Sequence, residues 1–123
     1  MKLFTLDQAN ALIPTLKPML ERIRGHYAEI NSQRDDARAA AGASDFGGGM
    51  QGGTGYVNAL YSVGKLTTEI HEMGVELKDY GNGMIDFPSM RNDRVVLLCW
   101  QLGEDEIEWW HEPEAGFAGR QRL

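Results

Sequence analysis

The sequence has few of the features that mark secreted, membrane-spanning or nucleic-acid-binding proteins. Its single cysteine cannot form an internal disulfide, which favours a reducing compartment. It has no run of about 18 apolar residues, so no membrane-spanning helix is predicted. The N-terminal segment also lacks the continuous apolar core of a signal peptide. These absences predict a soluble, cytoplasmic protein.

Basic residues are also scarce. Twelve Lys and Arg stand against 18 Asp and Glu, which gives a net charge of −6. Nucleic-acid phosphates and anionic lipid surfaces attract basic faces. Neither a nucleic acid nor a membrane is therefore expected as a partner. The length of 123 residues suits one domain, 1–123, with one hydrophobic core.

The N-terminal part has the signals of a helix start. Thr5 and Gln8 have the spacing of a capping box, in which each side chain bonds the other residue's backbone amide. Pro14 has no amide hydrogen and clashes with the preceding helical turn. We therefore predict a short helix over 6–12, a kink or break at Pro14, and a long helix over 15–41.

A second helix is predicted over 56–74. In both long helices apolar residues recur every three or four positions, as in the seam of packed or coiled-coil helices. These positions are Ala9, Ile13, Leu16, Leu20, Ile23, Tyr27 and Ile30 in the first, and Ala59, Val63, Leu66, Ile70 and Met73 in the second. Half of the residues between the helices, 42–55, are glycine. A G-x-G-x-x-G match at 47–52 lacks the preceding strand that a dinucleotide site needs. We interpret the segment as a flexible loop within an antiparallel helical hairpin.

Beyond residue 74 the spacing of apolar residues changes to the period of two that strands show. Strands are predicted over 75–78, 84–87, 94–102 and 107–112, separated by the turn sequences GNG, RND and GEDE. The third is apolar at successive positions, as in a central strand covered on both faces. Pro88 is expected to end the second strand, and the C-terminal tail to be irregular. The predicted fold is α+β, with a helical hairpin packed on a small antiparallel sheet.

Three stretches carry distinctive combinations of motifs. They read FTLDQANALIPTLKPML, GVELKDYGNGMIDFPSMRNDRVVLLCWQLGE and WWHEPEAGFAGRQ. Together they resemble the bacterial domain-of-unknown-function family 2203, from Thr5 to Gln121, with the Gly-rich loop as the divergent part. The resemblance implies a cytoplasmic bacterial protein and implies no activity.

The C-terminal part gathers the residues best suited to chemistry. Cys99 and His111 are a candidate nucleophile and base. If GEDE closes a hairpin, Trp100 faces Trp109, and Cys99 and His111 lie on opposite faces of the sheet. A loop of three or five residues would reverse this. We interpret Cys99 as a buried structural cysteine. The two tryptophans are interpreted as a cross-strand packing pair, with a ligand-stacking role as the alternative.

Asp86 lies between apolar residues of a predicted strand, and Arg120 lies in a glycine-flanked tail. If the tail folds over the sheet, Phe117 is expected to be buried and Arg120 to bind Asp86 or Asp79. This interpretation is a structural clasp. The alternative is a small-molecule pocket formed by Asp86, His111 and Arg120. The sequence has no known zinc- or calcium-binding motif, so no metal site and no cofactor is predicted.

Two functional hypotheses follow. The first is a self-associating interaction module, a homodimer or larger, because the first long helix would run roughly 40 Å and the second roughly 28 Å. The longer helix then extends past its neighbour or packs on another chain. A partner protein other than a second copy is the remaining alternative for this surface. The second is a small-molecule-binding protein or enzyme with a pocket under the C-terminal tail. The sequence shows no complete set of catalytic residues, which leans against an enzyme.

Overall fold

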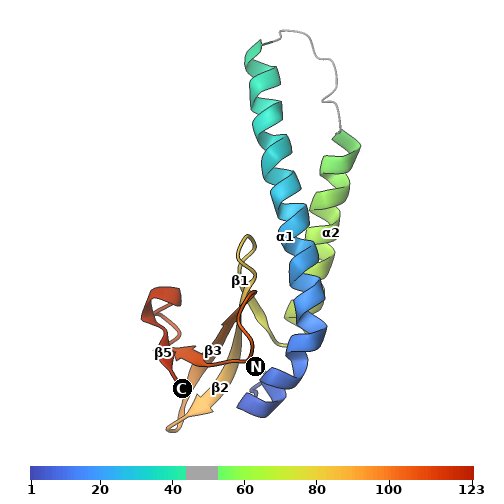
Figure 1. The fold of residues 1–123 in the computed structure, drawn as a ribbon. Coiled ribbons are helices and arrows are strands. Elements are labelled where there is room, and N and C mark those ends of the chain that lie inside the picture. Colours follow the sequence, from blue (N-terminus) through green and yellow to red (C-terminus); the bar gives the residue numbers. More distant parts are fainter. Residues whose placement is uncertain (44–52) are drawn as a thin grey trace.

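The protein forms two long helices and one five-stranded sheet (Figure 1). The computed structural model describes residues 1–43 and 53–123, with side chains described for 1–34 and 54–123. The elements are α1 (Leu6–Ala43), α2 (Gly53–Glu72), β1 (Glu76–Asp79), β2 (Met84–Arg91), β3 (Arg94–Gln101), β4 (Trp109–His111), the 3-10 turn η1 (Phe117–Gly119) and β5 (Gln121–Arg122). Neighbouring strands are antiparallel and follow one another in chain order. The predicted α+β class is confirmed.

α1 begins at the predicted capping box. The Thr5 backbone amide donates to Gln8 Oε1 at 2.9 Å, and the Gln8 amide donates to Thr5 Oγ1 at 3.1 Å. The helix continues through Pro14 and Pro18 as one element, so the predicted separation into 6–12 and 15–41 is wrong. Figure 1 shows the first turns of α1 inclined to the rest. A bend of this kind lets a helix accommodate an internal proline without ending.

The predicted seam forms the contact between the helices and the core beneath them. Ala9, Ile13, Leu16, Leu20, Ile23 and Ile30 of α1 are buried, as are Ala59, Leu66 and Ile70 of α2. Tyr27 is half-buried and contacts Tyr80, with ring centroids 5.6 Å apart. The lower part of the hairpin packs on one face of the sheet, and its upper part extends beyond the sheet (Figure 1).

β2 continues past Pro88, which corrects the prediction that this proline ends the strand. The Pro88 carbonyl accepts from the Phe4 amide at 2.8 Å, on the side of β2 away from β3. The nitrogen of a strand residue lies on the same side as its carbonyl. β1 pairs only with residues 84–86. The missing proline amide therefore removes no hydrogen bond between strands.

β4 and the C-terminal tail also differ from the predictions. β4 has three residues, because Ile107 leaves the sheet to enter the core. The C-terminal tail is not wholly irregular, since it contains η1 and pairs with β4 through β5. Most of the predicted Gly-rich loop, 44–52, and with it the G-x-G-x-x-G match, lies outside the described residues. Among the described helices, none is long and apolar enough to cross a membrane.

Candidate functional site

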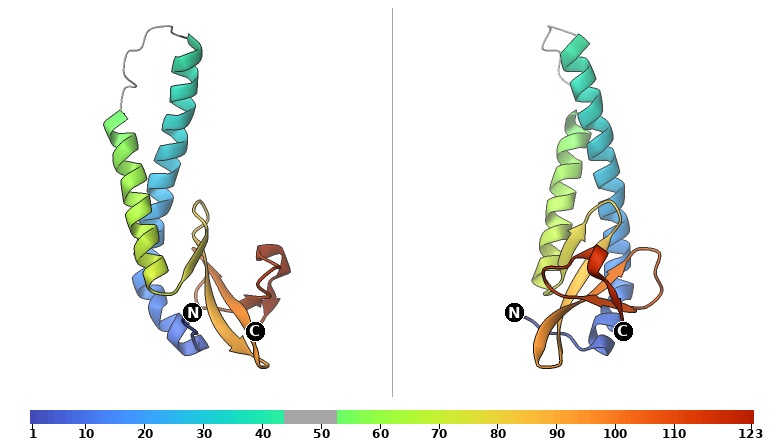
Figure 2. Two further views of the ribbon diagram at one scale, coloured as in Figure 1. Left: turned by 180° about the vertical axis from the view of Figure 1, so that it is seen from behind. Right: turned by 90° about the vertical axis from the view of Figure 1, so that its left-hand side faces the viewer.

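The two faces of the central strand β3 have different surroundings. Val96, Leu98 and Trp100 belong to the hydrophobic core shared with the helices. Cys99 points to the opposite face, because side chains alternate along a strand. The C-terminal tail lies on that opposite side of the sheet (Figure 2, right). β3 is therefore covered on both faces, as its continuous apolar sequence predicts.

The pairing of β3 with β4 places Cys99 and His111 on the same face. Cys99 lies opposite Trp109, and Leu97 lies opposite His111. The predictions of opposite faces and of a Trp100–Trp109 pair are therefore wrong. The connecting loop has an odd number of residues, from Leu102 to Glu108, and one residue of shift exchanges the two faces.

Hydrogen bonds to a side chain of β3 and to one of α1 fix this loop. The indole Nε1 of Trp100 donates to the Asp105 carbonyl at 3.2 Å. The Ile107 amide donates to Asn10 Oδ1 in α1 at 2.8 Å. The register of β4 is thus held partly by Asn10 of α1, which lies 97 residues before Ile107 in the chain.

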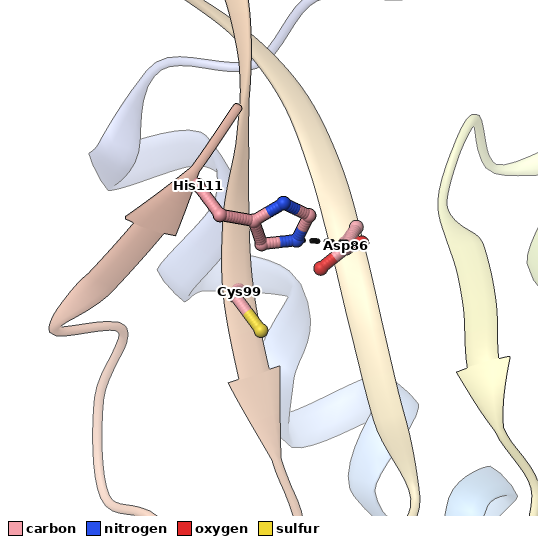
Figure 3. A group of neighbouring side chains, drawn as sticks. All are labelled: Asp86, Cys99 and His111. Atoms are coloured by element: carbon pink, nitrogen blue, oxygen red, sulfur yellow. Dashed lines mark hydrogen bonds and ion pairs between the residues drawn. The ribbon is translucent and has the colours of Figure 1, made fainter. Parts of the chain in front are cut away.

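Asp86, Cys99 and His111 form a buried cluster across three neighbouring strands (Figure 3). Asp86 in β2 lies directly opposite Cys99 in β3. The imidazole of His111 extends from β4 across β3, and its Nε2 lies 3.0 Å from Asp86 Oδ2. Both side chains are 1% exposed. One sulfur, one carboxylate oxygen and one imidazole nitrogen of the cluster lie within 4.8 Å of one another.

The hydrogen bonds indicate where the protons of this cluster lie. His111 Nδ1 lies 2.7 Å from the Glu112 carbonyl. A carbonyl only accepts, so Nδ1 carries a hydrogen. One further proton then lies between Nε2 and Asp86 Oδ2, as an imidazolium with a carboxylate or as a neutral imidazole with a carboxylic acid. The pair has zero net charge in either form, which suits its burial.

The surroundings keep the thiol neutral. Burial raises the pKa of Cys99 to about 12, and the neighbouring Asp86 carboxylate adds to this effect. Burial also raises the pKa of Asp86, while the charge and hydrogen bond of His111 act in the opposite direction. A thiolate is the reactive form of cysteine. The nucleophile–base reading of Cys99 and His111 therefore lacks support.

Arg120 lies on the same face but binds a different acid from the predicted ones. Its Nη2 lies 2.8 Å from both carboxylate oxygens of Glu104, and 3.5 Å from the Cys99 carbonyl. The guanidinium also lies over Trp109 at 5.0 Å and Phe117 at 4.8 Å from the ring centroids. The predicted pairs with Asp86 and Asp79 are wrong. Phe117 is 49% exposed rather than buried.

Asp86, His111 and Arg120 are not arranged as the expected open pocket. Asp86 and His111 are joined, but both are sealed from solvent. A cavity of about 280 Å³ beside the tail is lined by Asp79, Asn82, Met84, Gln101 and Phe117, and by none of those three. Trp100 faces the helices, so only Trp109 of the two candidate stacking residues lies on this face.

Comparison with known proteins gives a family and no activity. The model of the family described as uncharacterized conserved protein (DUF2203) matches residues 2–123. The chain belongs to this family. It matches no curated protein and no solved structure.

The burial predicted for Cys99 is confirmed, but its place beside His111 was not predicted, because the expected pairing of the strands assumed a short loop. Glu104 is the participant that sequence reasoning did not select. Glu104 lies in the acidic stretch GEDEIEWWHEPE, whose composition indicates acids near Trp109 but does not select one of them.

Proposed function

We propose that this DUF2203 protein is a self-associating module, in which the helical hairpin binds a second copy of the chain in the bacterial cytoplasm. An exposed apolar stripe on α2 carries the proposal. Val57, Leu60 and Tyr61 are 62%, 46% and 71% exposed. Spacings of three and four residues place them on one side of a helix. Contiguous exposed apolar surface with a polar border is typical of protein interaction sites.

The surroundings of this α2 stripe (Val57, Leu60 and Tyr61) support an interface. The stripe lies in the part of the hairpin that extends beyond the sheet (Figures 1 and 2). Of the described side chains in 24–34 and 54–65, only Ile30 and Ala59 are buried. A helix pair with so little burial is weakly stabilised in water. A second hairpin would complete a four-helix bundle and bury the stripe.

Charges on the two helices favour a second copy of the chain as the occupant. In a two-fold antiparallel pairing centred on Leu60 and Tyr61, Lys65 of one copy faces residue 56 of the other. Glu29 lies near that position, since its Oε1 is 3.5 Å from the place that a Cβ on Gly55 would take. The same Lys65–Glu29 pair forms twice by symmetry. Opposite charges at the border of an apolar contact fix its register.

Sedimentation of the purified chain over a range of concentrations tests this proposal. We expect a dimer that dissociates on dilution, and a monomer for both Leu60→Glu and Tyr61→Glu. Met90→Glu is the matched control, because Met90 is 52% exposed on β2, away from the stripe. A parent chain that stays monomeric at the highest concentration reached contradicts the proposal.

A charge exchange tests the antiparallel arrangement separately. Lys65→Glu and Glu29→Lys should each weaken the dimer through like-charge contacts. The double variant should recover much of the parent affinity. If the stripe variants dissociate the dimer but the double variant does not recover, the two copies pair in another register.

A further inference from the structure

We propose that Asp86, Cys99 and His111 form a binding site for a transition-metal dication, with zinc as the ion that fits the three side chains. This site is independent of the proposed self-association, since it lies in the sheet and the stripe lies on α2. Spacing along the chain gives no sign of it, because each residue comes from a different strand. Only the register of β2, β3 and β4 brings them together.

The distances suit a small ion with short bonds. Zinc binds thiolate sulfur at about 2.3 Å and imidazole nitrogen or carboxylate oxygen at about 2.0–2.2 Å. Tetrahedral angles then place the ligand atoms roughly 3.3–3.7 Å apart. The three candidate atoms lie within 4.8 Å of one another, and Nε2 and Oδ2 are already 3.0 Å apart. Small side-chain movements bring all three to bonding distance.

An unsatisfied oxygen points independently to a ligand. Asp86 Oδ1 is buried and has no hydrogen-bond partner among the described residues. The carboxylate belongs to a side chain that is 1% exposed, and a buried oxygen without a partner is costly. A metal ion bound by Oδ1, alone or together with Oδ2, supplies the missing interaction.

His111 is oriented as metal-binding histidines usually are. Its Nδ1 donates to the Glu112 carbonyl at 2.7 Å, which fixes the ring and directs Nε2 at the cluster. Histidines that bind metals commonly donate their second ring nitrogen to a backbone carbonyl or a carboxylate in this way. The backbone at the end of β4 therefore prepares the ring for an ion.

Charge is conserved when zinc replaces protons in the cluster. Without metal, the thiol is neutral and the Asp86–His111 pair has zero net charge. Zinc with a thiolate, a carboxylate and a neutral imidazole also sums to zero. The exchange releases two protons, one from Cys99 and the one shared by Asp86 and His111. Arg120 adds no uncompensated charge nearby, since Glu104 binds it.

The ligand types select the metal. Sulfur and nitrogen exclude calcium and magnesium, which prefer oxygen ligands. A mixed set of sulfur, nitrogen and oxygen suits zinc, and cobalt is its spectroscopic substitute. Three protein ligands leave the fourth tetrahedral position of zinc without a protein ligand.

The test uses the full chain after removal of metals with a chelator. Cobalt should bind with one ion per chain and give a near-ultraviolet thiolate-to-cobalt absorption band. Zinc titration by calorimetry in two buffers of different ionisation enthalpy should report two released protons. Cys99→Ser and Asp86→Asn should weaken binding by more than the about 10- to 100-fold expected for an outer-shell partner. His71→Gln, which changes an exposed histidine on α2, should leave binding unchanged.

Three results overturn the proposal. They are no binding by the folded parent, cobalt bound without the thiolate band, and zinc affinity unchanged in a folded Cys99→Ser chain. The second and third indicate an adventitious ion only, held by surface acids. Circular dichroism checks that each variant folds. If neither cluster variant folds, the absorption band and the proton count of the parent decide the question alone.

Discussion

Arg120 Nη2 lies 2.8 Å from both carboxylate oxygens of Glu104, and this ion pair joins the C-terminal tail to the β3–β4 loop. The Arg120 side chain is 10% exposed and that of Glu104 is 23% exposed. Glu104 also accepts from the Gln101 amide at 2.8 Å. The guanidinium is enclosed by the rings of Trp109 and Phe117. The tail is thus held by charge and by aromatic contact together.

Arg120→Ala should lower the free energy of unfolding by about 2–3 kcal/mol, because Glu104 is left without its partner in a partly buried place. Arg120→Lys should recover part of the loss, since one ammonium can reach both oxygens but stacks less well on the rings. Urea unfolding measures both. Arg94→Ala is the control, as its pair with Glu112 is more exposed and should contribute at most about 1 kcal/mol. Equal midpoints for Arg120→Ala and the parent would contradict the clasp.

Asp86 and His111 should behave as one unit in a double-mutant cycle. Asp86→Asn or His111→Gln alone should cost about 3–5 kcal/mol, because each leaves a buried partner with an unmatched charge or proton. The double variant should cost clearly less than the sum of the two, since it removes both members. Chemical unfolding of the metal-free chain gives the coupling energy. Additive losses would mean that the two side chains do not share a proton.

Patterns along the chain were sufficient to predict the helices, the sheet and its central strand. The helical seam and the period of two each depend on nearby residues, so they are visible in the sequence. The continuation of β2 through Pro88 is not, because it depends on how far β1 extends beside it. The residues around a proline do not show whether its nitrogen faces a neighbouring strand.

The candidate site was harder to predict for the same reason. Asp86, His111 and Arg120 were identified as unusual from their apolar or glycine-rich neighbours. Their partners depend on the β3–β4 register, which the contact of Ile107 with Asn10 helps to fix. The alternation of side chains along 94–112 contains no information about α1. The prediction based on it therefore placed Cys99 and His111 on opposite faces and did not include the cluster.

Asp79 should give the chain a pH-dependent stability at acid pH. Its carboxylate accepts from the Asn82 amide, the Asn82 side chain and the Gly81 amide at 2.8–2.9 Å. These bonds, foremost that of the Asn82 amide, lower its pKa. A carboxylate with a lowered folded-state pKa stabilises the fold above the unfolded pKa of about 4, and this is lost as pH falls through the folded value.

Asp79→Ala should therefore cost about 1 kcal/mol at neutral pH, and the difference from the parent should vanish in acid. Asp79→Asn is the comparison, because it keeps an acceptor oxygen for the two backbone amides but does not ionise. Its stability should depend less on pH than that of the parent. Urea midpoints measured across the acid range test both variants. A constant difference between parent and Asp79→Ala would rule out this role of the carboxylate.

Two glycines should respond in opposite directions to alanine. Gly83 has a φ of 65° in the β1–β2 turn, and a Cβ there would lie 2.5 Å from Leu102 Cδ1. Gly83→Ala should cost about 1–3 kcal/mol, through the positive φ and the displacement of Leu102. Gly25 lies in the exposed interior of α1 with nothing within 4 Å of a Cβ. Gly25→Ala should stabilise the chain by about 0.5–1 kcal/mol, because alanine favours the helix. Thermal unfolding compares the two, and a Gly83→Ala chain as stable as the parent would show that the turn tolerates a side chain against Leu102.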